Sequence, residues 1–336
     1  MTFAFILIFI ALIAVLILGH ELGHFIAAKL FKLRVDEFGF GFPPRIFSKK
    51  IGETKYSFNL IPFGGFVKIY GENAEGTEED VEPERSFYNQ PAWKRVVVIG
   101  AGVVMNFLIG WIIFASIFAV GVEPEGLKIV NVLPNSPAAE AGLETGDIIT
   151  GFESLEKFQE YLTANAGNEI AINGNIVIPR IDPPENEGRL GIVLAPTLHG
   201  RGFFGGIVYG FQASVDIVGK IFQGLGGIVT GIFKGDGEVL NSFAGPVGIF
   251  GIVRDTTSLG FVYLMQLTAI LSLNLMVFNL LPIPALDGGR LLFIAIEKII
   301  RKRLNSSHEA LAHTVGFILL ILLAIIVTVN DIVKII

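Results

Sequence analysis

Four long apolar runs dominate the pattern of hydrophobic and polar positions along the chain. The first covers Phe3–Leu18 and resumes over Phe25–Leu30, and together these stretches exceed the roughly 20 residues that cross a bilayer core. The other runs cover Val96–Val122, Phe261–Leu281 and Val315–Val329. The pattern therefore predicts four transmembrane helices.

The first run differs from a cleaved signal peptide, because no basic segment precedes it and no small-residue cleavage site ends it. We expect it to be retained as a span. The stretch Phe203–Phe233 is different, since it is rich in Gly and places Gln212, Asp216, Lys220 and Gln223 within one broad helical face. This spacing predicts an amphipathic helix at the membrane interface rather than a fifth span.

The hydrophilic segments between the spans differ in charge. Residues 31–95 carry ten Lys or Arg, and the short loop after the third span carries four more. Residues 123–260 instead hold 16 acidic and 8 basic side chains. Because basic loops stay in the cytoplasm, we place both basic segments there. The acidic segment and both termini then lie on the extracytoplasmic side.

The composition excludes several classes of protein. Apolar residues make up 52% and charged residues 17% of the chain, which is too apolar for a disordered protein. With no Cys, disulfide scaffolds, thiolate metal sites and Cys nucleophiles are excluded. The net charge of −6 and the lack of a long basic block argue against nucleic acid as a partner.

The sharpest motif is His20-Glu21-Leu22-Gly23-His24, inside the first span. Two His four residues apart stand on one helix face and can bind one Zn²⁺, while the adjacent Glu21 can accept a proton from water. The alternative is a helix end whose polar residues simply face water. We disfavour it, because ionisable groups between apolar flanks are costly and usually functional.

A catalytic zinc needs a third protein ligand. Asp287 is the one acidic residue between Phe261 and Ile296, and it is our first candidate. His313, at the start of the fourth span, is a weaker candidate that stays open.

The segment before Asp287 should interrupt the third span. Pro282 and Pro284 break a helix, while Gly288 and Gly289 permit unusual backbone angles. Irregular backbone at membrane depth is tolerated only where it is buried in protein or lines a wet cavity. This supports a functional interpretation of Asp287.

Together these motifs resemble the site-2 protease family of intramembrane zinc metalloproteases. The resemblance rests on His20–His24, on Asn279–Gly289 and, more weakly, on Ala244–Ile249, and it extends over nearly the whole chain. It is closest to the regulator-of-sigma-E protease branch, whose members carry PDZ domains.

The resemblance implies specific roles for residues of this chain. His20, His24 and Asp287 would ligate zinc, and Glu21 would be the catalytic base. Asn274 and Asn279 would help to bind the substrate backbone.

Residues Leu127–Ile149 alternate as strand, turn, short helix, turn and strand, a pattern that looks like the core of a PDZ domain. Ser136 should cap the short helix with Pro137 at its first position, and Gly142 should end it. Residues 152–196 would complete the module with a helix over Leu155–Ala164 and strands over 170–172, 176–178 and 190–194. A small α/β insert with the same turn residues is the alternative.

The first basic segment predicts three short strands: one where Phe and Gly alternate after Glu37, then Lys55–Ile61 and Gly65–Ile69. Their aromatic side chains suggest partial insertion into the membrane, although an ordinary cytoplasmic hairpin fits as well. In the family, one edge of these strands pairs with unwound substrate. The acidic stretch Glu72–Glu84 should be a solvated loop.

The predicted fold is a polytopic α-helical membrane protein with about four transmembrane helices, a small cytoplasmic membrane-associated β-sheet and an α/β PDZ insert. In chain order the segments are 1–31 (first span with the His-Glu motif), 32–92 (cytoplasmic strands), 93–122 (second span), 123–197 (PDZ domain), 198–258 (amphipathic and juxtamembrane region), 259–297 (broken third span), 298–312 (basic cytoplasmic loop) and 313–336 (fourth span).

The predicted function is zinc-dependent endopeptidase activity on transmembrane segments of membrane proteins, such as an anti-sigma factor or signal-peptide remnants. We expect a multi-pass protein of the inner or plasma membrane whose PDZ domain meets the extracytoplasmic part of the substrate. A metal transporter and a non-catalytic PDZ scaffold are the alternatives. Transporters often contain internal repeats, which this chain lacks, and neither alternative needs Glu21.

Overall fold

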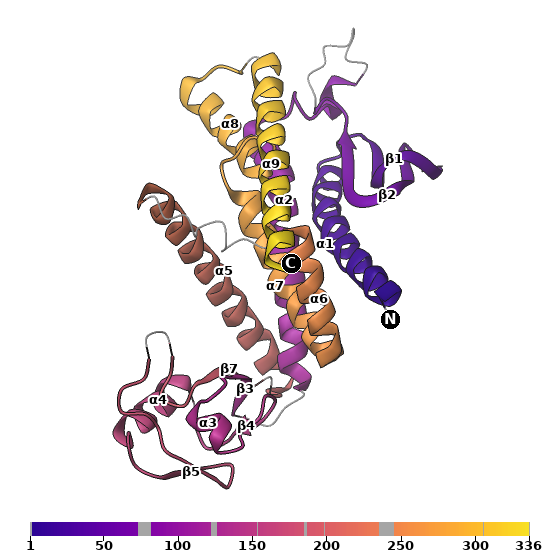
Figure 1. The fold of residues 1–336 in the computed structure, drawn as a ribbon. Helices are drawn as coiled ribbons and strands as arrows, with labels where there is room; N and C mark the ends of the chain where they lie inside the picture. Colours follow the sequence, from indigo (N-terminus) through magenta and orange to yellow (C-terminus); the bar gives the residue numbers. More distant parts are fainter. Residues whose placement is uncertain are drawn as a thin grey trace. The chain divides into compact units, whose positions relative to one another are not determined.

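The computed structural model describes residues 2–72, 82–121, 126–152, 154–184, 187–197, 199–234, 245–304 and 306–335. The chain divides into two compact units (Figure 1). Unit 1 consists of Met1–Phe114 and Gly210–Ile336, and unit 2 of Ala115–Tyr209.

Unit 1 is mainly helical. Its elements, two of which continue into unit 2, are α1 (Thr2–Leu30), β1 (Val35–Ile51), β2 (Thr54–Ile69), the 3₁₀ helix η1 (Pro83–Arg85), α2 (Ala92–Val120), α5 (Gly202–Lys234), α6 (Pro246–Leu259), α7 (Phe261–Leu280), α8 (Asp287–Ile300) and α9 (Ser306–Ile335).

Four helices in the described part of the chain are long and apolar enough to cross a membrane: Phe3–Leu30, Ala92–Val120, Phe261–Leu280 and His308–Lys334. They coincide with the four predicted runs, so the prediction of four such helices is confirmed. Only 17% of the most apolar stretch of α1, and 11% of that of α9, is buried by protein. Apolar surface on this scale fits a lipid environment. The predicted amphipathic helix forms as α5, which is not among the four.

Helix α1 is held by protein contacts near both ends. Towards its N-terminus, Leu12 and Leu16 are buried against Val253 of α6. Towards its C-terminus, Ala27 and Ala28 belong to an apolar cluster with residues of β1, β2, α2 and α8. The hairpin β1–β2 lies along this second part of α1 (Figure 1). The His-Glu motif therefore sits on a helix that neighbouring elements fix on both sides.

A buried carboxylate joins α9 to the start of α6. Asp331 accepts a hydrogen bond from the Gly248 N–H across 2.8 Å, where the first turn of α6 has free backbone donors. A Cβ on Gly245 would lie 2.7 Å from the same carboxylate, so a larger residue there would displace it. This contact explains the Gly-Pro-Val-Gly segment of the motif from Ala244 to Ile249; Ala244 itself lies outside the described residues.

The strands β1 and β2 correct the prediction of three short strands. All three predicted segments pair, but they belong to two long, irregular strands, and a fourth segment around Phe47 was missed. Phe38 pairs with Tyr56 on one side and with Val67 on the other, because both long strands bend back on themselves. Pro62 and the glycines after it therefore bend β2 rather than end it.

The turn between β1 and β2 is anchored to other parts of unit 1. Glu53 accepts a hydrogen bond from the Lys29 ammonium across 2.6 Å, and it also pairs with the Arg85 guanidinium. These two cations lower the pKa of the Glu53 carboxyl. Since all three side chains are about one third exposed, the network orients the hairpin more than it stabilises the fold.

Unit 2 is a small α/β module. Its own elements are β3 (Leu127–Val132), α3 (Pro137–Glu140), β4 (Ile148–Ile149), α4 (Leu155–Ala164), β5 (Ile170–Ile172), β6 (Asn175–Val177) and β7 (Ile192–Pro196). They form an antiparallel sheet in the order β4–β3–β7 and a separate hairpin, β5–β6.

Most local predictions for unit 2 are confirmed, but two strands are shifted: β6 covers Asn175–Val177 instead of 176–178, and β7 covers Ile192–Pro196 instead of 190–194. The Ser136 hydroxyl accepts the Ala139 N–H at the start of α3, and Gly142 has a φ of 76° just after its end. Helix α4 has the predicted bounds. Ile129 and Phe158 have no exposed surface and lie in the centre of an apolar core that joins the sheet to α4.

Candidate metal centre

Helices α1 and α2 approach each other closely beside the His-Glu motif. A Cβ on Gly23 would lie 2.3 Å from the Ala101 carbonyl oxygen of α2. A Cβ on Gly102 would lie 2.4 Å from the His24 ring. Because both positions are Gly, the two histidine rings come close to one face of α2, with their planes at 83° to each other.

The third predicted ligand comes from the break between α7 and α8. Helix α7 ends at Leu280, and Asp287 is the first residue of α8. In the turn between them Ala285 has a φ of 81°, and its N–H donates to the His313 Nδ1 atom across 2.8 Å. His313, the alternative third ligand, therefore supports the turn from α9 and lies outside the cluster.

The structure corrects the expectation that Gly288 has an unusual backbone angle. This residue lies in the first turn of α8 and does not have the left-handed φ that Ala285 has. A Cβ there would lie 2.2 Å from the Leu281 carbonyl oxygen. The chain passes so close to the start of α8 that position 288 requires glycine. Ala285 has the unusual backbone angle instead.

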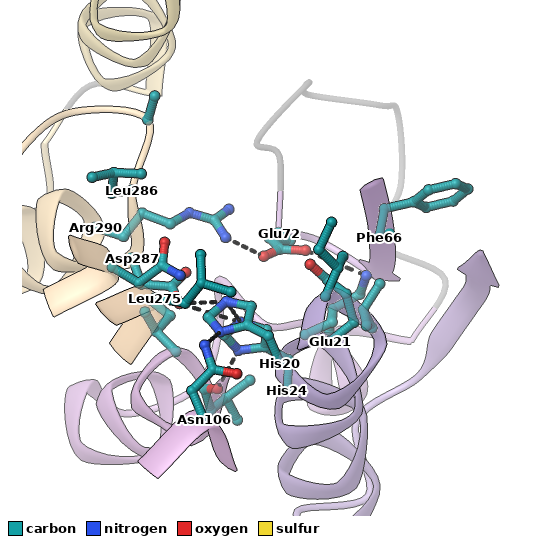
Figure 2. A pocket seen from close by; sticks show the side chains of 18 residues that line it. His20, Glu21, His24, Phe66, Glu72, Asn106, Leu275, Leu286, Asp287 and Arg290 are labelled. Atoms are coloured by element: carbon teal, nitrogen blue, oxygen red, sulfur yellow. Dashed lines mark hydrogen bonds and ion pairs between the residues drawn. The ribbon is translucent and has the colours of Figure 1, made fainter. Parts of the chain in front are cut away.

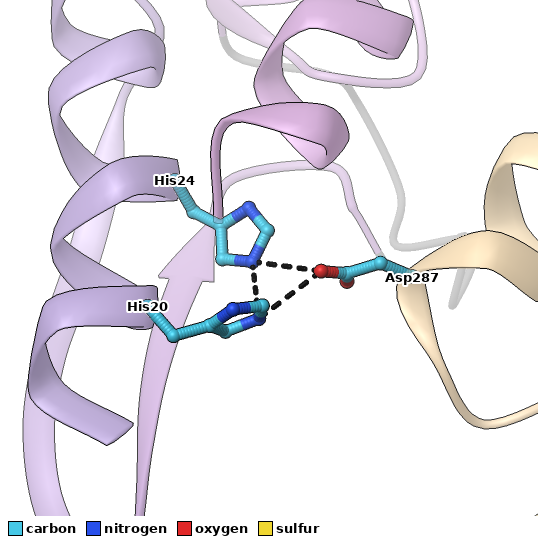
Figure 3. A group of neighbouring side chains, drawn as sticks. All are labelled: His20, His24 and Asp287. Atoms are coloured by element: carbon cyan, nitrogen blue, oxygen red, sulfur yellow. Dashed lines mark hydrogen bonds and ion pairs between the residues drawn. The ribbon is translucent and has the colours of Figure 1, made fainter. Parts of the chain in front are cut away.

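Three ligand atoms from distant parts of the sequence meet at one point (Figure 3). The Nε2 atoms of His20 and His24 are 3.1 Å apart, and Asp287 Oδ2 lies 3.1 Å from the first and 3.3 Å from the second. Bonds of 2.0–2.1 Å to a tetrahedral Zn²⁺ place its ligand atoms about 3.3 Å apart. The three separations therefore fit three corners of a zinc site.

The orientation of His24 supports the same conclusion. Its Nδ1 atom is 2.9 Å from the Val98 carbonyl oxygen, which can only accept a hydrogen bond, so the proton is on Nδ1. The lone pair on Nε2 is then free to bind a metal.

The ligand atoms line a cavity of about 430 Å³ in unit 1 (Figure 2). Glu21 and Asn279 also line it, and Gly65 of β2 comes so close that its Cβ would lie 3.0 Å from the Glu21 side chain. Asn274 does not line this cavity, and its amide donates to the Ile270 carbonyl within α7. Of the two predicted substrate-binding Asn, the structure brings only Asn279 to the metal ligands.

Sequence reasoning missed an ion pair in the wall of the cavity. Arg290, one turn after Asp287, donates to Glu72 across 2.5 Å, and the Glu72 side chain is only 15% exposed. The expectation that Glu72 begins a solvated loop is therefore wrong, because a cation at this depth requires a partner of opposite charge. The rest of that acidic stretch from residue 73 to 81 lies outside the described residues.

A second missed residue is Asn106 of α2. It is fully buried, and its side-chain nitrogen lies 3.1 Å from His20 Nδ1. A single amide within an otherwise apolar span was the signal that could have found it, because polar groups in such spans seldom lack a purpose.

Comparison with known proteins identifies the family. Residues 8–323 match the family model described as Peptidase family M50. The chain belongs to this family, the site-2 proteases. It is 37% identical over 334 residues to a Clostridium perfringens protein with the provisional name zinc metalloprotease, covering 95% of each chain.

Two further relatives carry the name RasP. The regulator of sigma-W protease RasP of Bacillus subtilis is 31% identical, with 96% of this chain and 97% of the relative covered. The zinc metalloprotease RasP of Bacillus licheniformis is 30% identical, with 98% of each covered. Membership of the peptidase family confirms the predicted enzyme class, a zinc metallopeptidase, and the names of these relatives agree with Zn²⁺ as its cofactor.

Proposed function

We propose that this site-2 protease cleaves transmembrane segments of membrane proteins and that its metal centre consists of His20, His24 and Asp287. The observation that carries the proposal is the meeting of these three side chains, together with Glu21, in one cavity. The helices around that cavity expose mainly apolar surface. A hydrolytic site enclosed by such helices suits a substrate that also lies in the bilayer.

The two histidines and the aspartate offer two neutral nitrogens and one carboxylate oxygen. This ligand set is typical of catalytic zinc sites that keep a position open for water or substrate. When bound, zinc supplies a Lewis acid that polarises a carbonyl group and makes water more acidic.

Glu21 provides the acid–base chemistry. It follows His20 directly on α1, and it lines the same cavity. Its carboxylate takes a proton from the attacking water and then delivers that proton to the leaving amine nitrogen. Because Glu21 is half-buried in the cavity wall, the same carboxylate can hold the proton between the two steps.

The substrate would bind in extended form beside β2. The segment from Gly65 to Ile69 pairs with β1 on one side, and no described strand pairs with its other side. A substrate strand added there would place its backbone next to Glu21, because a Cβ on Gly65 would lie 3.0 Å from that side chain. Asn279 in the cavity wall would hold a substrate carbonyl or amide, and Asn274 is a second candidate from the family resemblance.

Unit 2 would act as a PDZ domain that meets the extracytoplasmic part of the substrate. A pocket of about 450 Å³ lies between α4 and β7, lined by Phe158, Leu162 and Val193 among others. Strand β7 pairs with β3 on one side, and no other described strand pairs with it. A peptide could therefore add to β7 as a further strand.

The proposed topology has a direct test. Reporter proteins fused after residue 150 and after residue 303 should lie on opposite sides of the inner or plasma membrane. Signals on the same side would mean an even number of spans between them and would implicate α5 as a further span.

The proteolytic function is tested with purified protein and a single-span peptide substrate. Cleavage should occur with zinc, stop with a chelator and return when zinc is added back. A metal transporter or a non-catalytic scaffold would show no cleavage under any of these conditions. Zinc uptake into vesicles that contain the protein would then separate the transporter from the scaffold.

A further inference from the structure

Asn106 is a partner of the metal centre that the proposed mechanism does not use. It is fully buried in α2, and Ser272 of α7 holds its backbone by donating to its carbonyl oxygen across 2.8 Å. Its side-chain amide points at the ring of His20 (Figure 2). Asn106 therefore lies where α2 meets α7, with its side chain directed at α1.

The two histidines meet α2 in parallel ways. His24 Nδ1 lies 2.9 Å from the Val98 carbonyl oxygen, and His20 Nδ1 lies 3.1 Å from the Asn106 amide, eight residues further along α2. Gly102, midway between them, lets both rings lie against this face of the helix. One face of α2 thus contacts the Nδ1 atoms of both rings, and both Nε2 atoms point to Asp287.

The orientation of the amide decides which tautomer His20 adopts. With the side-chain nitrogen of Asn106 facing Nδ1, the amide donates and the histidine proton must be on Nε2. Such a histidine cannot bind a metal through Nε2. Among the described residues, the Asn106 Oδ1 atom in this orientation is buried without a hydrogen-bond partner.

Rotating the amide by half a turn exchanges the two atoms without changing the shape of the side chain. Oδ1 then accepts the His20 Nδ1–H, and the Nε2 lone pair is free towards His24 and Asp287. His20 can therefore bind a metal through Nε2 when the Asn106 amide has this orientation, and not when it has the other.

We propose that Asn106 is a positioning residue of the metal centre, whose side-chain oxygen accepts the Nδ1–H of His20 and thereby holds Nε2 towards the metal. The proposal rests on the proposed role of His20 as a zinc ligand. The outer partners of metal-bound histidines typically change metal affinity about 10–100-fold.

Zinc affinity of the purified full-length protein, measured by competition with a chelator, provides the test. Asn106→Leu has a similar shape but no acceptor, and we expect it to weaken zinc binding about 10–100-fold. Asn106→Asp keeps an acceptor oxygen and no longer offers an amide donor. It should bind zinc as tightly as the native chain, within about threefold, or more tightly.

Ser272→Ala is the matched control, because it removes a hydrogen bond to the Asn106 backbone and leaves the amide in place. It should bind zinc like the native chain. Equal losses in Asn106→Asp and Asn106→Leu would mean that the amide acts as a donor, and would overturn the proposal. Unchanged affinity in Asn106→Leu would overturn it as well.

Nitrogen-15 spectra of the histidine rings give a readout that a general loss of packing would not reproduce. The zinc-loaded native protein should show a protected Nδ1–H for His20, and Asn106→Asp should retain it even if Asn106→Leu does not fold. A His20 ring without a proton on Nδ1 in the zinc-loaded protein would contradict the proposal. Zinc affinity in His20→Ala tests the ligand assignment separately, since no loss there would remove His20 from the metal centre whatever Asn106 does.

Discussion

Unit 2 encloses a compact apolar core, whereas the long helices of unit 1 turn many of their apolar side chains outward. Phe158 of unit 2 has no exposed surface, but Phe317 of α9 exposes 58% of its surface. The polar groups show the opposite distribution. Arg95 and Glu297 of unit 1 form a buried pair, while the Arg180–Glu187 pair of unit 2 is partly accessible.

This contrast indicates that the two units are stabilised in different ways. Unit 2 buries apolar area away from water, as soluble domains do. In lipid that driving force is absent between helices, so packing and buried polar contacts must specify how the helices of unit 1 meet. The proposed metal ligands belong to the same class of interior polar groups, so the proposed chemistry of unit 1 depends on the contacts that also arrange its helices.

The largest effect is expected for Glu21→Gln, which removes the proton acceptor from the interior of unit 1 and leaves the three ligands in place. The cleavage rate should fall about 10²–10⁴-fold. The zinc content should stay that of the native chain. Glu140→Gln, an exposed carboxylate of unit 2, is the control and should change neither. Loss of zinc together with activity in Glu21→Gln would mean that Glu21 is a metal ligand.

Removing one member of the buried ion pair should strongly destabilise unit 1. Arg95→Met leaves the Glu297 carboxylate without its charged partner, which lies 2.5 Å away, and should cost about 3–5 kcal/mol. Denaturant unfolding in detergent, followed by circular dichroism, measures the loss. Much of it should return in the double variant with Glu297→Leu.

The matched change in unit 2 is Arg180→Met, which breaks a pair whose side chains are 25% and 35% exposed, together with an exposed hydrogen bond to the Asn135 carbonyl. Solvent screens that pair, so its loss should cost about 0–1 kcal/mol. Equal costs for Arg95→Met and Arg180→Met would contradict the contrast between the two units.

Two phenylalanine substitutions test whether apolar side chains stabilise the two units differently. Phe158→Ala should leave a cavity in the core of unit 2 and cost about 3–5 kcal/mol, measured by hydrogen exchange of the β3 and β7 amides. Phe317→Ala removes an outward-facing ring from α9 and should cost far less in detergent. A comparable loss in both would mean that the outer face of α9 packs against protein.

The smallest effect on the metal centre is expected from deleting residues 126–196 and joining the ends with a short flexible linker. None of the proposed ligands lies in this stretch, so zinc content and cleavage of a substrate with a short external stub should persist. Cleavage of a substrate with a bulky external domain should stay equal or rise if unit 2 acts as a size filter. If the trimmed substrate is no longer cut although zinc and folding are normal, unit 2 recruits substrates instead.

The sequence predicted features that depend on local pattern. The four apolar runs and the bounds of α4 follow from residue periodicity, and the His-Glu motif follows from the spacing of two histidines on one helix. Asp287 could be selected because it is the one acid in a long apolar segment.

Features that depend on contacts between distant segments could not be predicted. The pairing of Phe38 with two partners requires β1 and β2 to bend back, which no local signal encodes. The contact between Asn106 and His20 joins residues 86 positions apart. The pairing of Glu72 with Arg290 spans an even longer stretch, and either residue alone has the properties of a solvated charge.

Zinc K-edge X-ray absorption of the purified protein tests the central claim most directly. The account predicts two imidazole rings in the zinc shell together with a carboxylate oxygen, at about 2.0–2.2 Å from the metal. In Asp287→Ala the carboxylate contribution should disappear while both imidazoles stay. A native shell with three imidazoles, unchanged in Asp287→Ala, would contradict the assignment and make another histidine, such as His313, the third ligand.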